Sequence, residues 1–190
     1  MTVAELIQRA WRRWDILPGP MQFLRVLLLR LRGAQVGAGT WLPRVLVPWP
    51  HQLSLGQRCI IEPDVYFKYD GFWTPGPSIQ IGNRVFIGRN TEFNITGGIT
   101  IGDDCLIASG CTFVDGDHGM APDRPMNEQP LNRAAIVLEE NVWLGAQCVV
   151  LKGVRLGRGA VIGAGSVVTK SVPAGEVWAG TPARRLKQAA

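Results

Sequence analysis

The stretch LEENVW LGAQCV VLKGVR LGRGAV IGAGSV VTKSVP, residues 138–173, divides into six consecutive units of six residues without an insertion. Each unit opens with Leu, Ile or Val, and its fifth residue is small: Val, Cys, Ala or Ser. On short strands both positions would point inward. Because no single unit can bury its own apolar face, the units are expected to stack and bury one another. The pattern therefore predicts a solenoid with a column of aliphatic side chains at its centre.

The same unit recurs upstream, at residues 36–41, 55–66, 81–92 and 101–112. Three breaks interrupt it, at residues 66–80, 93–100 and 113–137. The sequence thus predicts an all-β solenoid over residues 33–178 with loops at 66–80 and 113–137. Glycine is frequent at the second position of a unit, where we expect it to permit the bend between two flat faces.

All four cysteines occupy the fifth position of a unit, where other units carry Val, Thr, Ala or Ser. Because small residues fill this position in the other units, we expect the cysteines to be small buried side chains as well. A disulfide framework or a cysteine metal site is not expected. The cysteines are Cys59, Cys105, Cys111 and Cys148.

Composition and charge narrow the class of protein. The chain has 190 residues, 46% of them hydrophobic and 18% charged, which is typical of a globular protein. Its 23 glycines and 13 prolines argue against a helical bundle. Six arginines among residues 1–32 account for most of the net charge of +5. The nearly neutral remainder lacks the basic stripe that a nucleic-acid-binding surface requires.

Residues 1–32 are predicted to form a basic, helical, amphipathic segment, since Leu24, Leu27, Leu28 and Leu31 recur at helical spacing. Its apolar stretch is too short to span a bilayer or to act as a signal peptide, so a cytoplasmic protein is expected. Two readings remain open for these leucines. They pack on the body or on a partner subunit, or residues 20–32 lie on an anionic membrane surface with help from Trp11 and Trp14.

The repeat units, together with the run from His118 to Arg185, resemble the hexapeptide-repeat acyltransferases, and specifically their acetyltransferase branch. The similarity is strongest to polysaccharide and lipopolysaccharide O-acetyltransferases and to the galactoside and maltose acetyltransferase group. It implies a left-handed parallel β-helix with three units per coil. It further implies acetyl-CoA as co-substrate, a sugar or glycan acceptor, no metal, and a homotrimer with active sites between subunits. The acidic residue that the helical start of the galactoside and maltose enzymes supplies to the acceptor has no match here, so their acceptors are not carried over.

His118, in the sequence DGDHG, is the candidate general base because an imidazole titrates near neutral pH. With His51 as the only other histidine, a three-histidine zinc site cannot be built in one chain. The resemblance assigns Asn94 to the acceptor, the Ala146 N–H to the oxyanion and Trp143 to the cleft wall. A carboxylate should orient the imidazole. The candidates are Glu128, which we favour, Asp115 and Asp117.

CoA carries phosphates, which require cations and backbone N–H groups. By resemblance, Ala164 and Gly165 hold the pantetheine arm, and Thr169 and Lys170 hold the phosphate end. Arg184 belongs to a C-terminal CoA-binding tail, residues 179–190. Lys152 would add to the positive charge of this CoA-binding region only if it faced the same side of the solenoid.

Alternatives stay open at this level. The aromatic segment 66–78 could stack on sugar rings, or it could pack on the wall or on a neighbouring subunit. The chain could also be a non-catalytic scaffold, or it could acetylate an antibiotic or serine. A measurement of CoA affinity separates scaffold from enzyme, and an acceptor screen separates the acceptors.

Overall fold

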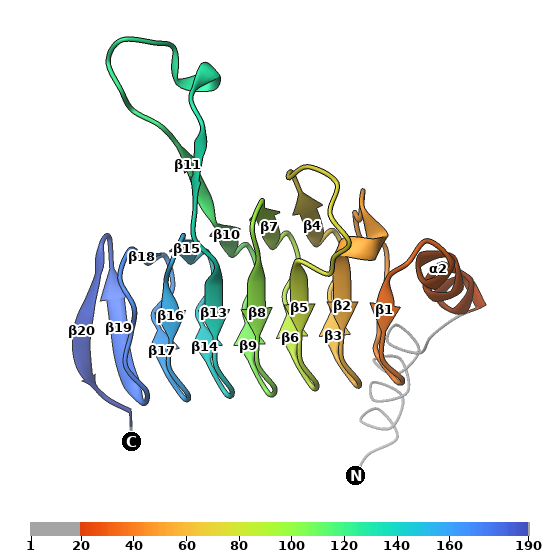
Figure 1. The fold of residues 1–190 in the computed structure, drawn as a ribbon. Coiled ribbons are helices and arrows are strands. Elements are labelled where there is room, and N and C mark those ends of the chain that lie inside the picture. The colour runs from red at the N-terminus through yellow and green to blue at the C-terminus, as the bar shows by residue number, and fades with distance from the viewer. Residues whose placement is uncertain (1–19, 190) are drawn as a thin grey trace.

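A computed structural model describes residues 20–189 of the chain. Trp11, Trp14 and most of the predicted segment 1–32 lie outside the described residues. Figure 1 shows a solenoid whose successive coils lie side by side, with helix α2 (Pro20–Leu31) at its N-terminal end.

Three parallel sheets form the walls, and we name them A, B and C. Sheet A contains β1 (Gln35–Val36), β2 (Leu53–Leu55), β5 (Ile79–Ile81), β8 (Ile99–Ile101), β13 (Ile136–Leu138) and β16 (Arg155–Leu156). Sheet B contains β3 (Ile60–Ile61), β6 (Phe86–Ile87), β9 (Leu106–Ile107), β14 (Trp143–Leu144), β17 (Val161–Ile162) and β19 (Glu176–Gly180), closed by the antiparallel β20 (Ala183–Gln188). Sheet C contains β4 (Tyr66–Tyr69), β7 (Glu92–Ile95), β10 (Thr112–Val114), β15 (Val149–Leu151) and β18 (Val167–Val168).

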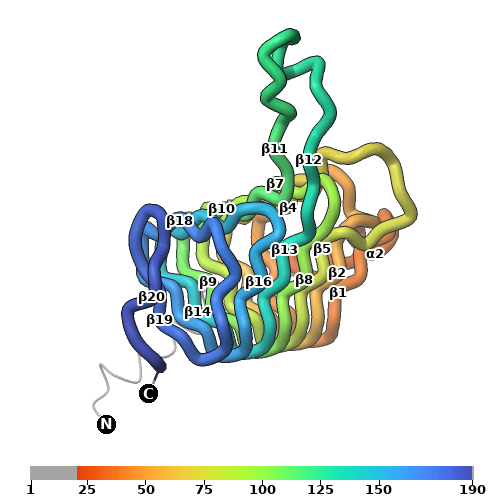
Figure 2. Tube along the Cα trace, turned by 60° about the vertical axis from the view of Figure 1, so that its left-hand side comes forward, coloured from red at the N-terminus to blue at the C-terminus, as the bar shows by residue number. Residues whose placement is uncertain are grey.

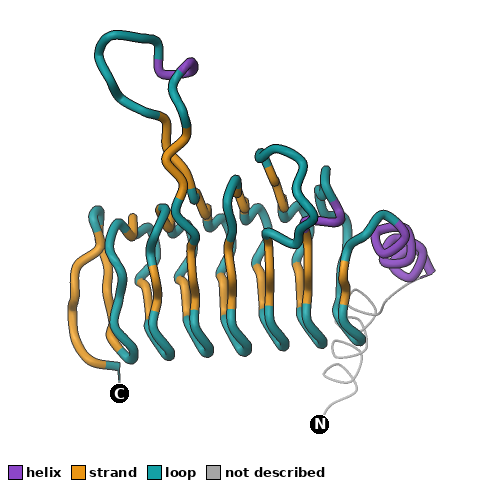
Figure 3. The backbone as a smooth tube through the Cα atoms, in the orientation of Figure 1, coloured by secondary structure: helices purple, strands orange, loops and turns teal. Residues whose placement is uncertain are grey.

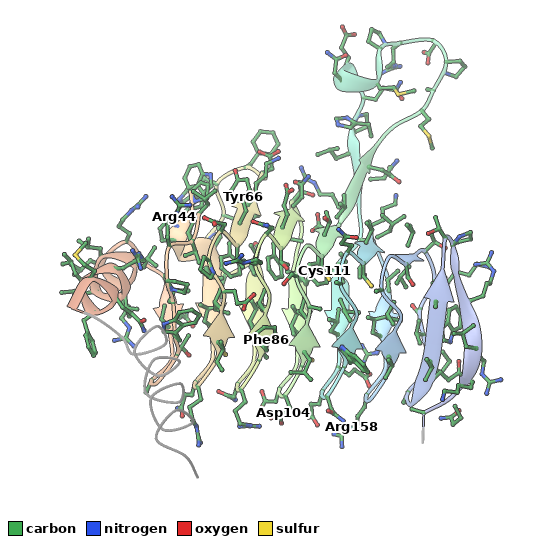
Figure 4. All side chains as sticks on the ribbon, turned by 180° about the vertical axis from the view of Figure 1, so that it is seen from behind. Arg44, Tyr66, Phe86, Asp104, Cys111 and Arg158 are labelled. Carbon is green, nitrogen blue, oxygen red and sulfur yellow. The ribbon has the colours of Figure 1, made fainter. Side chains whose placement is uncertain are left out.

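The chain visits the sheets in the order A, B, C once per coil, which gives a triangular prism with three edges that we call AB, BC and CA. Figure 2 shows the stacked coils, and in Figure 4 Asp104 and Arg158 mark the AB edge at the bottom of the view. This architecture is the predicted left-handed β-helix. Its left-handed crossover is an exception to the right-handed rule for parallel strands.

The interior follows the six-residue unit. First-position residues such as Ile87 and Leu144 have no exposed surface, and neither do the four cysteines at the fifth position, which confirms them as small buried residues. Burial raises the pKa of the Cys105 thiol to about 11, so it stays protonated at neutral pH. On sheet C, Phe67, Phe93 and Phe113 stack with ring centroids 5.0 and 4.9 Å apart.

Glycine at the second position has a different role from the predicted one. Within the repeat, the residues with positive φ occupy the fourth position of the six-residue unit, for example Arg84 (55°), Asp104 (60°) and Gly159 (68°). Second-position glycines lie instead where coils approach each other. A Cβ at Gly56 would fall 2.4 Å from the carbonyl oxygen of Gly82. Glycine is therefore needed for the close stacking of coils, and the bend is made two residues later.

Two predicted loops are shorter than the breaks in the repeat. Tyr66–Tyr69 forms β4, with Phe67 and Tyr69 buried, so the loop covers only residues 70–78. The second predicted loop, at residues 113–137, contains an antiparallel hairpin of β11 (Gly116–His118) and β12 (Leu131–Arg133), with a short helix η2 (Met126–Glu128) near its tip. Figure 3 shows the hairpin projecting far from the CA edge. A further short helix, η1 (Pro50–Gln52), precedes β2 on the same edge.

Helix α2 packs on the first coil through a face that the leucine pattern does not predict. Leu29 is buried, Arg25 Nη1 donates to the Leu42 carbonyl (3.3 Å) and Gln22 Nε2 donates to the Thr40 carbonyl (3.3 Å). The predicted stripe points away from the solenoid. Its exposed members are Leu24, Leu27, Leu28 and Leu31. The prediction that these leucines pack on the body is therefore wrong, and cover by a partner subunit stays a prediction beside the membrane reading.

Candidate active site

His118 is the last residue of β11 and pairs in register with Leu131 of β12. Its side chain is exposed near the base of the hairpin. In Figure 1 the hairpin leaves the prism between β10 and β13, at the CA edge. An imidazole in this place is accessible to a substrate that lies along this edge, as a general base must be.

Asp115 ties the foot of the hairpin to the preceding coil. Its buried carboxylate accepts hydrogen bonds from the backbone N–H groups of Thr96 (2.7 Å), Gly97 (2.7 Å) and Gly98 (2.7 Å). The Thr96 hydroxyl donates a fourth, at 2.9 Å. With these four donors Asp115 acts as a structural anchor, and it forms no hydrogen bond with His118 within residues 20–189.

Asp117 is also engaged by a partner other than His118. Lys152 Nζ, from the next coil, lies 2.7 Å from Asp117 Oδ1 and 3.4 Å from the carbonyl oxygen of Asn132 on the facing strand. The hydrogen bond from Lys152 lowers the pKa of Asp117, so the pair remains ionised at neutral pH. Lys152 thus fastens both strands of the hairpin to the wall. It follows β15 and so lies on the same CA edge as Lys170, one coil earlier, with its charge paired to Asp117.

Glu128 is exposed in η2 and makes no side-chain hydrogen bond to His118 in the described part of the chain. The neighbouring Gln129 organises this region instead. Its buried amide accepts from Ala121 N–H (2.8 Å) and donates to the carbonyl oxygens of Ala121 (2.9 Å) and Arg124 (2.9 Å). No feature of the sequence distinguished Gln129 from the other polar residues of the break.

Asn94 lies on the outer surface of sheet C, in register with Lys68 on one side and Val114 on the other. Its strand comes one coil before the hairpin, and its amide forms no hydrogen bond with any residue between 20 and 189. Asn94 thus lies on the strand that precedes the hairpin strand by one coil, at the end of the strand nearest the CA edge, and its amide is available to a ligand.

Ala146 and Ala164 occupy equivalent turns of successive coils on the BC edge. The flanking N–H groups are used, since Gly145 donates to the Ile162 carbonyl and Gly165 to the Ala146 carbonyl, both at 2.8 Å. In contrast, the N–H groups of Ala146 and Ala164 donate to no acceptor among the described residues, and both alanines are exposed. Two free N–H donors on one edge are what the oxyanion and pantetheine roles implied by the family resemblance would require.

Trp143 stands beside this edge on the outer surface of sheet B, with 52% of its side chain exposed. It pairs with Leu106 and Val161 in the neighbouring coils. The row extends along the sheet in both directions. Its outward members are Trp41, Ile60, Phe86, Leu106, Trp143, Val161 and Val177.

The tail folds back on the BC edge. The Thr181 hydroxyl donates to the Gly165 carbonyl (3.3 Å) and Gly180 N–H donates to the Ser166 hydroxyl (3.0 Å). Arg184 follows on β20 and is exposed, and it forms no ion pair with residues 20–189. Arg185, by contrast, is paired with Glu176 at 2.8 Å.

Thr169 and Lys170 follow β18 and therefore lie on the CA edge, beyond Lys152. Both are exposed, and Lys170 has no acidic partner in the described chain. The predicted site residues thus fall into two groups in one chain. His118, Asn94, Thr169 and Lys170 belong to the CA edge or its border, and Ala146, Ala164, Gly165 and the tail belong to the BC edge.

Two other properties of the described residues, 20–189, bear on the site. They contain no group of three or more His, Cys, Asp or Glu side chains arranged to hold a metal ion. No helix among them is long and apolar enough to cross a bilayer.

Comparison with known proteins places this geometry in a family. The pattern described as "Bacterial transferase hexapeptide (six repeats)" matches residues 135–170, and "Hexapeptide repeat of succinyl-transferase" matches residues 78–112. The galactoside O-acetyltransferase of Escherichia coli K12 is 35% identical over 135 residues, covering 71% of this chain and 63% of that enzyme. The chain thus spans about three fifths of the length of this relative, and 59% of its Lactococcus lactis counterpart.

Two further relatives are matched over a larger share of their own length. A putative lipopolysaccharide biosynthesis O-acetyl transferase of E. coli K12 is 32% identical over 148 residues, covering 68% of this chain and 76% of that protein. A hexapeptide-repeat-containing acetyltransferase from Vibrio cholerae O1 biovar eltor, solved in complex with acetyl coenzyme A, is 26% identical with a TM-score of 0.65. That similarity covers 99% of this chain and 89% of the Vibrio chain. On sequence, repeat and fold together, the chain belongs to the hexapeptide-repeat acetyltransferase family.

Proposed function

We propose that the protein transfers an acetyl group from acetyl-CoA to a hydroxyl, or less often an amine, of a sugar or glycan in surface polysaccharide or lipopolysaccharide biosynthesis. The observation that carries this proposal is the exposed His118, held by a hairpin whose foot is fixed by Asp115 and Lys152. The similarity to the lipopolysaccharide O-acetyl transferase supports the acceptor class.

In the proposed mechanism His118 takes the proton from the acceptor hydroxyl, and the resulting oxygen attacks the thioester carbonyl. The free N–H of Ala146 stabilises the negative charge that forms on the carbonyl oxygen. When the carbon–sulfur bond breaks, the imidazolium of His118 returns its proton to the leaving thiolate. Asn94 orients the acceptor through its free amide. No acyl-enzyme is needed, because both reactants are bound at once.

The residues of the BC edge and the tail fit acetyl-CoA. Ala164 and Gly165 present backbone polar groups to the pantetheine arm, and Trp143 flanks them with an apolar surface. Arg184 of the tail offers a cation without an acidic partner in residues 20–189. In the trimer proposed below, the CA edge of the neighbouring copy adds a second such cation, Lys170, and the hydroxyl of Thr169. This set supplies what a pyrophosphate and a 3′-phosphate require.

We further propose a homotrimer in which the CA edge of one copy faces the BC edge of the next. Two observations support it. His118 and Ala146 lie on different edges of one chain, so one complete site needs two chains. The exposed apolar row along sheet B gives a second copy a surface to cover. A monomeric mass in sedimentation equilibrium would contradict this assembly.

The proposed activity is tested by CoA release from acetyl-CoA in the presence of a panel of sugars, nucleotide sugars and lipid-linked glycans. Wild-type protein should release CoA with at least one carbohydrate, at a rate well above thioester hydrolysis without acceptor. Turnover only with serine or an antibiotic would show that the acceptor is not a carbohydrate. Absence of both CoA binding and turnover would favour the non-catalytic scaffold.

Helix α2 gives a second proposal, that this end of the solenoid makes peripheral contact with the inner face of the membrane. Its leucines point away from the body, and Arg32 is exposed beside them, as an anionic lipid surface would require. In vesicle flotation, wild type should float with vesicles containing phosphatidylglycerol and remain below with pure phosphatidylcholine.

The double variant L24E/L28E should lose this flotation, because it places two charges on the inserted face. A matched control is L186E, which changes an exposed leucine on β20, away from α2. If the double variant floats like wild type, or if wild type never floats, α2 does not bind membranes.

A further inference from the structure

Four aromatic side chains gather on the CA edge without being used by the proposed chemistry. Trp49 and His51 precede β2, and Phe72 and Trp73 lie in the loop between β4 and β5. The His51 ring stacks on Trp73 with centroids 6.2 Å apart, and Trp49 meets His51 edge-on at 5.7 Å. We call Trp49, His51, Phe72 and Trp73 the aromatic platform.

The two rings of the loop, Phe72 and Trp73, are not buried in the chain's own core. Phe72 is 84% exposed and Trp73 is 70% exposed, so the loop does not pack them on the wall as one reading of the sequence expects. Exposing two large aromatic side chains in one loop is unfavourable unless a partner covers them.

Buried polar residues beneath the platform hold the loop in a defined shape. Gln52 is almost fully buried, and its amide donates to the Thr74 carbonyl (2.8 Å) and accepts from Ser78 N–H (3.1 Å). The buried Tyr69 hydroxyl donates to the Phe72 carbonyl (3.0 Å). Gln52 also contacts His51, with Gln52 Nε2 3.0 Å from His51 Nε2. The rings are thus presented by a preorganised scaffold, which reduces the entropy lost when a ligand binds.

The platform and His118 share one edge of the prism. The loop 70–78 follows β4, and the hairpin follows β10, which is two strands along sheet C. Neighbouring strands are about 4.8 Å apart, so the two features are separated by roughly 10 Å along the solenoid axis. Only the short turn 96–98 lies between them, and both features project from the same side of the prism in Figures 1 and 3.

We infer that the aromatic platform binds sugar rings of an extended glycan acceptor. These rings lie a few sugar units away from the sugar whose hydroxyl His118 deprotonates. A pyranose has an apolar C–H face that packs on aromatic rings and a polar rim for water and hydrogen bonds. Lys68, near the end of β4, and Asp70, the first residue of the loop, are paired at 2.9 Å and supply polar groups at its border. The inference rests on the proposed function and adds to it that the natural acceptor is an oligomer or polymer.

The test compares acceptors of one glycan series, from monosaccharide to hexasaccharide, taken from the panel member that supports CoA release. For wild type, kcat/KM should rise with length until the chain reaches the platform. The double variant F72A/W73A should lose about tenfold in kcat/KM for the hexasaccharide, equivalent to about 1.4 kcal/mol of lost contact. The monosaccharide reaction and the KM for acetyl-CoA should not change. F23A, which removes a comparably exposed ring on α2, is the control.

Binding is measured separately, without acetyl-CoA, on an array of bacterial surface hexasaccharides. Wild type should bind at least one, and F72A/W73A none. If no acetyl transfer occurs but this binding difference holds, the proposed function fails and the platform stands. Equal losses for all acceptor lengths, dissociation of the assembly in F72A/W73A, or no binding by wild type would each overturn the platform.

Discussion

Replacing His118 with alanine should reduce kcat for acetyl transfer by roughly 10²- to 10⁴-fold, the usual contribution of a positioned general base. The fold should survive, because the side chain is exposed and the residue pairs with Leu131 only through the backbone. The measurements are steady-state CoA release with a saturating acceptor, and thermal unfolding followed by circular dichroism.

Met120→Ala is the matched control, since Met120 is an exposed residue two positions further along the hairpin. It should retain near-wild-type kcat. If H118A turns over at a rate close to wild type, the acceptor is activated by another group and His118 has no part in the chemistry.

Replacing Phe93 with alanine should have the largest effect on stability, a loss of about 3–5 kcal/mol. Phe93 has no exposed surface and is the middle ring of three, with centroids 5.0 Å from Phe67 and 4.9 Å from Phe113. Its removal opens a cavity between two coils. In a solenoid each coil is supported only by its neighbours, so the loss is felt on both sides.

Urea unfolding monitored by circular dichroism measures this loss. Phe72→Ala removes the same atoms from an exposed position and should change the free energy of unfolding by less than about 0.5 kcal/mol. If F93A and F72A unfold at similar urea concentrations, the phenylalanine stack does not stabilise the solenoid.

The six-residue pattern predicted the core of this fold well because it reports one physical variable, the alternation of inward and outward side chains. It placed Cys105 and Cys148 inside correctly. It could not show why glycine is needed at Gly56, since a Cβ there would lie only 2.4 Å from the carbonyl oxygen of Gly82 in the next coil, and the local backbone does not reveal this. Contacts between coils are invisible in a single unit.

The leucine pattern of α2 shows a different limit. Periodicity identifies an apolar face but not what covers it. In the structure Leu29 is buried, Arg25 donates a hydrogen bond to the Leu42 carbonyl of the first coil, and Leu24 and Leu28 are left exposed. An apolar face is buried by the body only when the body has a matching surface there.

For the site, the sequence indicated His118 and Asn94, which the structure brings to one edge. It could not assign the carboxylates, because their partners lie a coil away. The Asp115 carboxylate accepts hydrogen bonds from the turn 96–98, and the Asp117 carboxylate pairs with Lys152, 35 positions further along the chain. Such pairs are set by how coils stack, and the irregular break around the hairpin hides that register in the sequence.

A single-turnover reaction with acetyl-CoA labelled in the acetyl group tests the central claim most directly. Wild-type protein, acetyl-CoA and the acceptor identified in the panel are mixed, and the label is located by mass spectrometry. Direct transfer predicts label on the glycan, an equal amount of free CoA, and none on the protein, with the transfer slowed roughly 10²- to 10⁴-fold in H118A. Label bound covalently to the protein, or label reaching the glycan equally fast in H118A, would contradict it.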